Sequence, residues 1–308
     1  PVFAYSSKAM PGAKSVSLFL VEDERVQASL IARGVAAERI KLVGSLMIDG
    51  VGARRGREEA RSRLGMEQHE RVIMLFPGLR GREVSVTAPF LFRAAELLAR
   101  VEQNVSFILC LSPFVGTASL EQLFSHTAHA ARIDGAAARV EKSAGPLEAI
   151  TAEGIRIRIE TVLMYEAMAA SDIAVCTPGP VCAELAYLGV PHVVTAPLNV
   201  PGAVAVPGVS PLLCSLPFIG ETFQRRAVDR LKASSRFVSV ANQRAGRMIA
   251  PEIVGRLRPE DVVIPCVELL GEAARRDKMS RELREAVGLT GAADRVVQAI
   301  QRVVLSQQ

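Results

Sequence analysis

The feature that most constrains this chain is a repeated alternation between short apolar runs and segments with helical spacing. Between residues 71 and 197 the apolar runs are RVIMLF, VSFILC, GIRIRIE, DIAVC and PHVVTAP, and stretches such as VTAPFLFRAAELLARV and VCAELAYLG separate them. Strands that alternate with helices pair in parallel, because each helix returns the chain to the start of the next strand. The pattern predicts an α/β fold with a doubly wound parallel sheet over residues 65–200.

The residues before this alternation have the pattern of the end of another domain. Residues 17–21 and 40–43 are predicted as short strands, and Asp23 to Arg33 as a helix that stops at Gly34. A single strand–helix–strand unit cannot bury a core by itself. We therefore expect residues 1–50 to complete a partial first domain, with a charged linker at 51–64.

After the linker we expect a nucleotide-sugar-binding domain at 65–285 and a terminal helix at 286–308 that crosses back to the first domain. Residues 119–133 are predicted as one helix, and residues 237–240, FVSV, resemble a strand. The chain from Pro259 onward is predicted as three helices, with Asp277 and Thr290 as caps.

The composition narrows the class of partner. Aromatic residues make up 5% of the chain and tryptophan is absent, which disfavours stacking on single-stranded nucleic acid. The net charge of +5 suits phosphates or an anionic membrane surface. The five cysteines are expected to be buried free thiols in a reducing compartment, since no CxxC pair occurs. With no clean membrane span or signal peptide in the sequence, a cytoplasmic location is expected.

Two turns are candidate sites, because ligands of open α/β sheets bind at the carboxyl ends of strands. The first, FPGLRGRE, follows the run VIMLF and offers Gly78 for close backbone approach and Arg80 for charge. The alternative is an exposed turn with solvated arginines. The second, TPGPVCAE, follows DIAVC.

In the second turn, Gly179 precedes a helix that is expected to begin at Pro180, where proline fits the first helical position. The N–H groups of Val181, Cys182 and Ala183 would then be free to bind an anion. An ordinary βα turn without a ligand is the alternative. Glu184, one turn later, would either complement the helix dipole or accept hydrogen bonds from ribose hydroxyls.

A third polar segment, from Phe237 to Glu252, contains Asn242, Gly246 and Arg247, and is either a wall of the same crevice or a surface loop. The histidines form no metal set: His126 and His129 are expected at the surface, and His192 as a satisfied core or edge residue. The sequence contains no GxSxG, Walker or GxGxxG motif.

Several of these segments, in this order, resemble the lipid-A-disaccharide synthase family. They are RVIMLFPGLRGREV, AASDIAVCTPGPVCAELAYLGVPHVV, FVSVANQRAGRMIAPEIVG and the closing ELLGEAARRDKMSRELREAVGLTGAADRVVQAI, and KLVGSLMIDG resembles the family's interdomain segment. The resemblance implies a GT-B fold and transfer of a sugar from a UDP-sugar to a lipid-linked acceptor, without a metal or other cofactor.

The resemblance also implies which residues bind the nucleotide. The matched positions are Pro77, Gly78, Arg80, Glu83, Gly179, Glu184, Asn242, Ala245, Gly246, Arg247, Pro251 and Glu252, and Pro180, Val181 and Cys182 complete the helix start. The chain departs from the family where Leu79 replaces a serine and where Pro178, Pro180, Val181 and Cys182 replace small hydroxyl residues. The chain therefore resembles a divergent member of the family, and the sugars that it binds need not be those of lipid A.

Further expectations concern the catalytic role and the partners. The family's catalytic base would lie before Pro1, so no catalytic residue is named. The alternatives are a non-hydrolysing UDP-sugar epimerase and a non-catalytic nucleotide-sugar-binding remnant or subunit. The apolar and basic segment 197–235 is expected to contact the inner membrane face or a lipid acceptor. The alternative is that it packs against the part of the first domain expected before Pro1, and a homodimer is left open.

Overall fold

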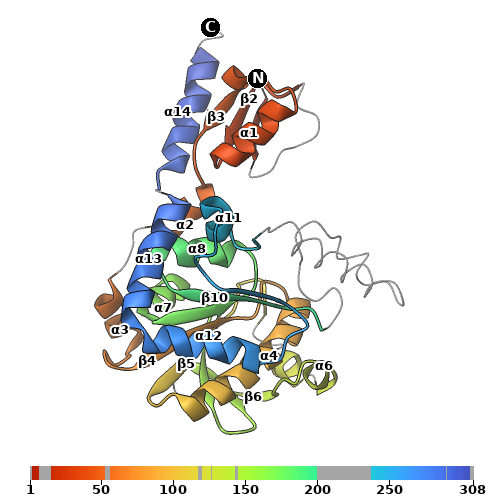
Figure 1. The fold of residues 1–308 in the computed structure, drawn as a ribbon, viewed down its shortest axis with the longest axis vertical. Coiled ribbons are helices and arrows are strands. Elements are labelled where there is room, and N and C mark those ends of the chain that lie inside the picture. Colours follow the sequence, from red (N-terminus) through yellow and green to blue (C-terminus); the bar gives the residue numbers. More distant parts are fainter. Residues whose placement is uncertain are drawn as a thin grey trace. The chain divides into compact units, whose positions relative to one another are not determined.

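The computed structural model describes residues 2–6, 15–52, 56–116, 120–125, 127–142, 145–199, 237–288 and 290–305. They form two compact units, one made of Pro1–Ala53 with Gly288–Gln308 and the other of Arg54–Val287 (Figure 1). The second unit is a continuous stretch of chain, whereas the first combines two stretches. None of the described helices has the length and apolar character that crossing a bilayer requires.

The first unit is a three-stranded parallel sheet in the order β1-β2-β3, formed by β1 (Phe3–Ser6), β2 (Leu18–Val21) and β3 (Ile40–Leu42). Side chains alternate between the two faces of a strand. Phe19 and Val21 therefore pack with α1 (Glu24–Ala32) on one face. Leu18 and Leu20 pack on the other face with α14 (Ala292–Leu305).

The start of α14 is capped from a distant part of the chain. Asp49, in α2 (Leu46–Val51), accepts hydrogen bonds from the N–H groups of Gly291 (2.7 Å) and Ala293 (2.6 Å). The expectation that Thr290 caps this helix is therefore wrong. Folding brings a carboxylate to the N–H groups that have no partner within the helix start. The local sequence around the helix could not show this contact.

The second unit contains an eight-stranded sheet in the order β11-β10-β9-β4-β5-β8-β7-β6. Its strands are β4 (Arg71–Phe76), β5 (Val105–Cys110), β6 (Ala138–Lys142), β7 (Leu147–Thr151), β8 (Arg156–Glu160), β9 (Ile173–Cys176), β10 (His192–Pro197) and β11 (Glu252–Gly255). All pairs from β11 to β8 are parallel, so the predicted parallel sheet is confirmed. The antiparallel strands β6 and β7 form an edge that the sequence did not predict.

The helices of this unit are α3 (Arg57–Leu64), α4 (Gly81–Val101), α5 (Leu120–Phe124), α6 (Thr127–Arg132), α7 (Met164–Ala170), α8 (Pro180–Leu188), α11 (Val240–Ala245), α12 (Glu260–Gly271) and α13 (Ala273–Val287). The single helix expected at 119–133 is two short helices, because the chain leaves helical geometry at Ser125. The ring of Phe124 packs edge-on against Phe92, 5.0 Å between centroids, and anchors α5 to α4.

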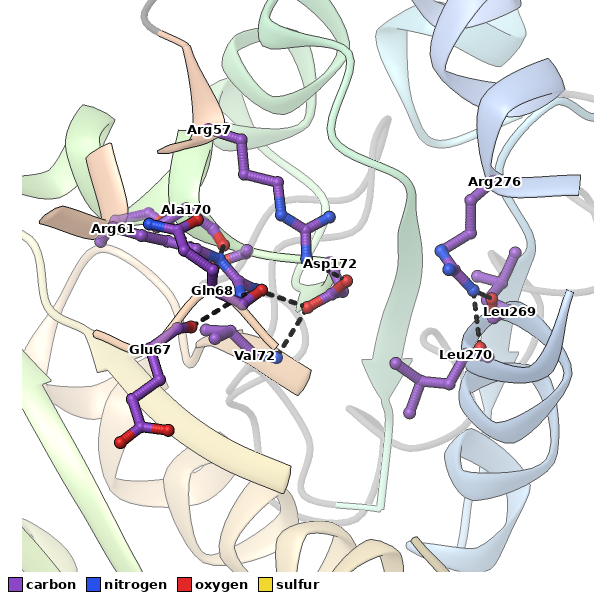
Figure 2. A network of polar contacts seen from close by, with 12 residues as sticks. Arg57, Arg61, Glu67, Gln68, Val72, Ala170, Asp172, Leu269, Leu270 and Arg276 are labelled. Atoms are coloured by element: carbon purple, nitrogen blue, oxygen red, sulfur yellow. Dashed lines mark hydrogen bonds and ion pairs between the residues drawn. The ribbon is translucent and has the colours of Figure 1, made fainter. Parts of the chain in front are cut away.

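Two further expectations about local structure are wrong. The segment FVSV is not a strand, because Ser239 caps α11 by accepting from the Asn242 N–H, so a helix starts within the apolar run. Asp277 is not a cap, because it lies inside α13. The break between α12 and α13 instead falls at Glu272, where Arg276 donates to the carbonyls of Leu269 and Leu270 at the end of α12 (Figure 2).

The amino ends of β4 and β9 are held by a buried ionic network (Figure 2). Arg61 of α3 has no solvent exposure and donates to Asp172 (2.9 Å) and to the carbonyls of Ala170, Glu67 and Gln68. Asp172 also accepts from the Val72 N–H at 2.8 Å and pairs with Arg57. Through this network α3 is fixed to the sheet as part of the second unit.

Candidate functional site

The turn after β4 is built around Gly78 and Glu83. Gly78 has a φ of +115°, and a Cβ atom there would lie 2.2 Å from Cδ of Glu83. Only glycine combines this backbone conformation with such a close approach. The Leu79 N–H donates to Oε2 of Glu83 at 3.0 Å. The carboxylate of Glu83 therefore folds back over the turn, a contact that the sequence did not predict.

Glu83 also links this turn to the one after β9. Its side chain hydrogen-bonds the side chain of Thr177, and the Thr177 N–H donates to the Phe76 carbonyl at 3.4 Å. Burial raises the pKa of Glu83, opposed by Leu79, Thr177 and Arg80. Two of the three predicted segments are thus assembled at the carboxyl ends of adjacent strands β4 and β9.

The turn after β9 leads into α8 with proline at its first position, as predicted. One detail is different: the N–H of Cys182 donates to the Gly179 carbonyl at 3.2 Å, so it is not a free donor. The Cys182 side chain is fully buried, with its Sγ 3.6 Å from Sγ of Cys176. Cys182 therefore shapes the turn from inside, and its N–H group is used within the turn.

Glu184 lies one turn into α8 and is half-buried. Burial raises its pKa, and the hydroxyl of Tyr165 opposes that rise by donating to Oε1 at 3.4 Å. The pKa of the Cys110 thiol, at the end of β5, is raised by burial and by the charges of Glu160 and Glu184. Glu184 is therefore near the carboxyl ends of β5 and β8 as well as on the helix that follows β9.

The third predicted segment is engaged by other parts of its own unit. Asn242 is fully buried; its amide donates to Ala250 and Glu252 and accepts from the N–H groups of Ile249 and Ala250. These contacts give Asn242 a role in shaping the loop, and its expected contact with a ligand stays a prediction.

The other two residues of this segment have local roles as well. Gly246 ends α11 with a φ of +66°, the left-handed conformation common after a helix. Arg247 is exposed and pairs with Glu282 of α13 at 3.2 Å. None of the interactions described for Asn242, Gly246 or Arg247 reaches the turns after β4 and β9.

The cysteines and histidines are the remaining candidates for reactive or metal-binding side chains. Cys110, Cys176, Cys182 and Cys266 are buried free thiols, as predicted, and Cys214 lies outside the described residues. His192 is fully buried but only half satisfied, since Nδ1 is 2.9 Å from the Val190 carbonyl while Nε2 has no partner. His126 and the side chain of His129 lie outside the described part. No cluster of three metal-ligating side chains occurs among the described residues.

Sequence reasoning missed two kinds of residue at these carboxyl ends. Tyr165, the partner of Glu184, stands inside a helical segment with no motif around it. Phe114 and Val162 follow β5 and β8 and are 84% and 82% exposed, and Leu79 after β4 is 41% exposed. These large apolar side chains lie in three loops that follow neighbouring strands. Their exposure depends on the folded structure and cannot be predicted from the sequence.

The structure and the site together define a class of protein. The doubly wound parallel sheet is an α/β fold of the GT-B type. At the carboxyl ends of its strands lie a helix that begins with proline and a half-buried acid. The family model described as lipid-A-disaccharide synthetase matches residues 36–140. The chain is similar to lipid-A-disaccharide synthases.

Two curated lipid-A-disaccharide synthases illustrate the relationship. The chain is 28% identical over 266 residues to the one from Prochlorococcus marinus, and 26% identical over 261 residues to the one from Syntrophus aciditrophicus. These alignments cover 85% and 83% of this chain but 57% and 55% of the relatives. The chain thus spans little more than half the length of the curated relatives it matches.

Solved structures show the same fold at low sequence identity. The UDP-GlcNAc 2-epimerase from Neisseria meningitidis, bound to UDP-GlcNAc, superposes with a TM-score of 0.53 at 10% identity, covering 94% of this chain and 62% of that chain. Staphylococcus aureus MnaA with UDP gives 0.53 at 14% identity, covering 95% and 61%. At these identities the likeness establishes the fold alone.

Proposed function

We propose that this chain carries the nucleotide-sugar-binding part of a glycosyltransferase that moves a sugar from a UDP-sugar to a lipid-linked acceptor. The observation that carries the proposal is Glu184, a half-buried carboxylate one turn inside a helix whose start lies at the carboxyl end of β9. The curated relatives of the chain are lipid-A-disaccharide synthases, and proteins of the same fold are described with UDP or UDP-GlcNAc bound.

Each part of the nucleotide has a proposed partner. The N–H groups of Val181 and Ala183 bind the diphosphate, favoured by the partial positive charge of the helix start. Glu184 accepts hydrogen bonds from the ribose hydroxyls. Arg80, exposed in the neighbouring turn, contacts the phosphates or the transferred sugar. In this proposal Gly78 and Glu83 shape the turn that carries Arg80, through the contacts described above.

The test is calorimetric titration of UDP into the wild type, Glu184→Ala and a control, Glu285→Ala, which removes an exposed glutamate from α13. If Glu184 bonds ribose hydroxyls, its loss costs about 1.5–3 kcal/mol, or roughly a ten- to hundredfold loss of affinity. The control should bind as the wild type does. Equal UDP affinity in all three proteins would remove Glu184 from the site, and no binding by the wild type would reject the proposed function.

UDP-sugar epimerisation is the second candidate, because the Neisseria epimerase shares the fold. An epimerase of this kind would need a histidine in the crevice. Of the described histidines, His192 is fully buried in β10 and His69 is exposed just before the amino end of β4. Incubation with UDP-GlcNAc alone separates the two activities: an epimerase changes the sugar without an acceptor, whereas a transferase requires one. A binding subunit without catalysis would bind UDP and do neither.

The lipid-linked acceptor leads to a proposal about location. Segment 197–235, described only as far as residue 199, combines apolar residues with Arg225, Arg226, Arg230 and Lys232, and Arg236 follows it. It would hold an anionic inner membrane face. Co-sedimentation with vesicles containing anionic lipid should decrease when the segment's basic residues are neutralised. Equal sedimentation of both proteins would reject membrane contact by this segment.

A further inference from the structure

Tyr165 and Glu184 face each other from two helices of the second unit. Tyr165 lies in the first turn of α7, and its hydroxyl is 3.4 Å from Oε1 of Glu184 in α8. Both residues are half-buried. The pKa of Tyr165 is raised by burial and by the neighbouring charge and hydrogen bond of Glu184, so the hydroxyl remains a donor at neutral pH.

The helix that carries Tyr165 has a firmly held start. Oε1 of Glu160, the last residue of β8, accepts from the N–H groups of Thr161, Val162 and Leu163 at 2.9–3.0 Å. This one carboxylate satisfies three backbone donors ahead of α7. Glu184 is fixed in turn by α8, which follows β9 directly. The distance between the two side chains is therefore set by two helices, each of which directly follows a strand of the same sheet.

A carboxylate that binds two adjacent hydroxyls must present its oxygens in one orientation. In the proposed nucleotide site, the hydroxyls of ribose are such a pair. A half-buried carboxylate with a free rotor would lose affinity through the entropy of ordering its side chain. A hydroxyl that donates to Oε1 restricts that rotation and leaves the remaining lone pairs for the ligand.

We propose that Tyr165 is a positioning residue, which holds the Glu184 carboxylate so that it distinguishes ribonucleotides from 2′-deoxyribonucleotides. This inference rests on the proposed function, because it takes the ligand to be a nucleoside diphosphate. Tyr165 acts through Glu184 and need not touch the ligand.

The experiment compares UDP with 2′-deoxy-UDP by calorimetric titration into the wild type and Tyr165→Phe. The wild type should prefer UDP. In Tyr165→Phe the affinity for UDP should fall about three- to tenfold, as expected for one lost hydrogen bond, while that for 2′-deoxy-UDP changes little. The preference for UDP should shrink accordingly. The phenylalanine keeps the ring, so a purely packing role for Tyr165 predicts an unchanged preference.

A matched control is available in the first unit. There the Tyr5 hydroxyl donates to Glu22 at 2.8 Å, so Tyr5→Phe removes the same kind of bond elsewhere and should leave the preference intact. Thermal unfolding checks that both variants are folded. The inference is overturned if the wild type and Tyr165→Phe prefer UDP equally. If the wild type binds neither nucleotide, the proposed function fails and this inference with it.

Discussion

At the amino ends of β4 and β9, Arg61 and Asp172 are buried and paired, whereas Glu184, on the helix that follows the carboxyl end of β9, is half-buried and sparsely paired. Arg61 makes four hydrogen bonds without any solvent exposure, and its carboxylate partner Asp172 also binds a backbone N–H. At the other end, the interaction described for the Glu184 side chain among the described residues is one hydrogen bond of 3.4 Å.

The difference separates groups that hold the fold from groups that can serve a ligand. A buried charge with every partner in place has no capacity left for a ligand, and losing one partner is costly. A half-buried carboxylate with lone pairs to spare gains from each hydroxyl that a ligand brings. Substitutions at the two ends should therefore affect different measurements, stability at the amino end and affinity at the carboxyl end.

The largest effect is expected at the amino end. Arg61→Met leaves Asp172 buried without its main partner and should lower the free energy of unfolding by about 3–5 kcal/mol, measured by urea denaturation. The double variant Arg61→Met with Asp172→Leu should cost less than Arg61→Met, because no buried charge is left unpaired. If Arg61→Met remained as stable as the wild type, the ionic network at the amino ends of β4 and β9 would not stabilise the sheet.

An intermediate effect is expected from His192. Burial lowers its pKa from 6.5 to about 4, so between pH 6.5 and 4 the unfolded chain binds a proton that the folded chain does not. The free energy of unfolding should therefore fall as the pH decreases through this window, by at most about 3 kcal/mol. Chemical denaturation at several pH values in wild type and His192→Leu measures it.

The comparison with His192→Leu isolates this contribution from those of other groups. Glu83 and Glu184 have raised pKa values, so the folded state retains their protons and their contributions to stability have the opposite slope in acid. His192→Leu keeps them, so its stability should fall less than that of the wild type, or rise, as the pH decreases from 6.5 to 4. Identical pH profiles for the two proteins would show that His192 is protonated in the folded state.

The smallest effect is expected from Arg247. Its pairing with Glu282 is exposed, and such pairs contribute about 0–1 kcal/mol. Arg247→Ala should therefore change stability by no more than this and leave UDP affinity unaltered, as calorimetry can measure. A tenfold loss of UDP affinity would instead place Arg247 in the nucleotide site and restore the convergence of three segments that the sequence suggested.

The sequence predicted the parallel sheet because its strands β4, β5 and β9 are mostly apolar and each is followed by a helix. It could not predict β6 and β7, whose residues ARVEK and LEAIT are partly polar and lie at the edge of the sheet. Apolar character also misled at FVSV, where the capping hydrogen bond of Ser239 starts a helix.

The candidate site was predictable where local geometry sets the residue type. Pro180 at the start of α8 and Gly78 in the turn after β4 follow from backbone requirements that a sequence displays. The burial of Asn242 and the partnership of Tyr165 with Glu184 depend on contacts between distant residues. The capping of α14 by Asp49 also depends on a contact between distant residues, since 244 positions separate Asp49 from Ala293.

The return of α14 to the sheet of the first unit has a consequence for the order of events during synthesis. The strands of that sheet leave the ribosome early, but the side chains of Leu18 and Leu20 remain uncovered until α14 has been made. The second unit, encoded without interruption between Arg54 and Val287, can complete its sheet in the meantime. Domains usually fold in the order in which they are translated. Here the first unit receives the contacts of α14 only after the whole second unit has been made.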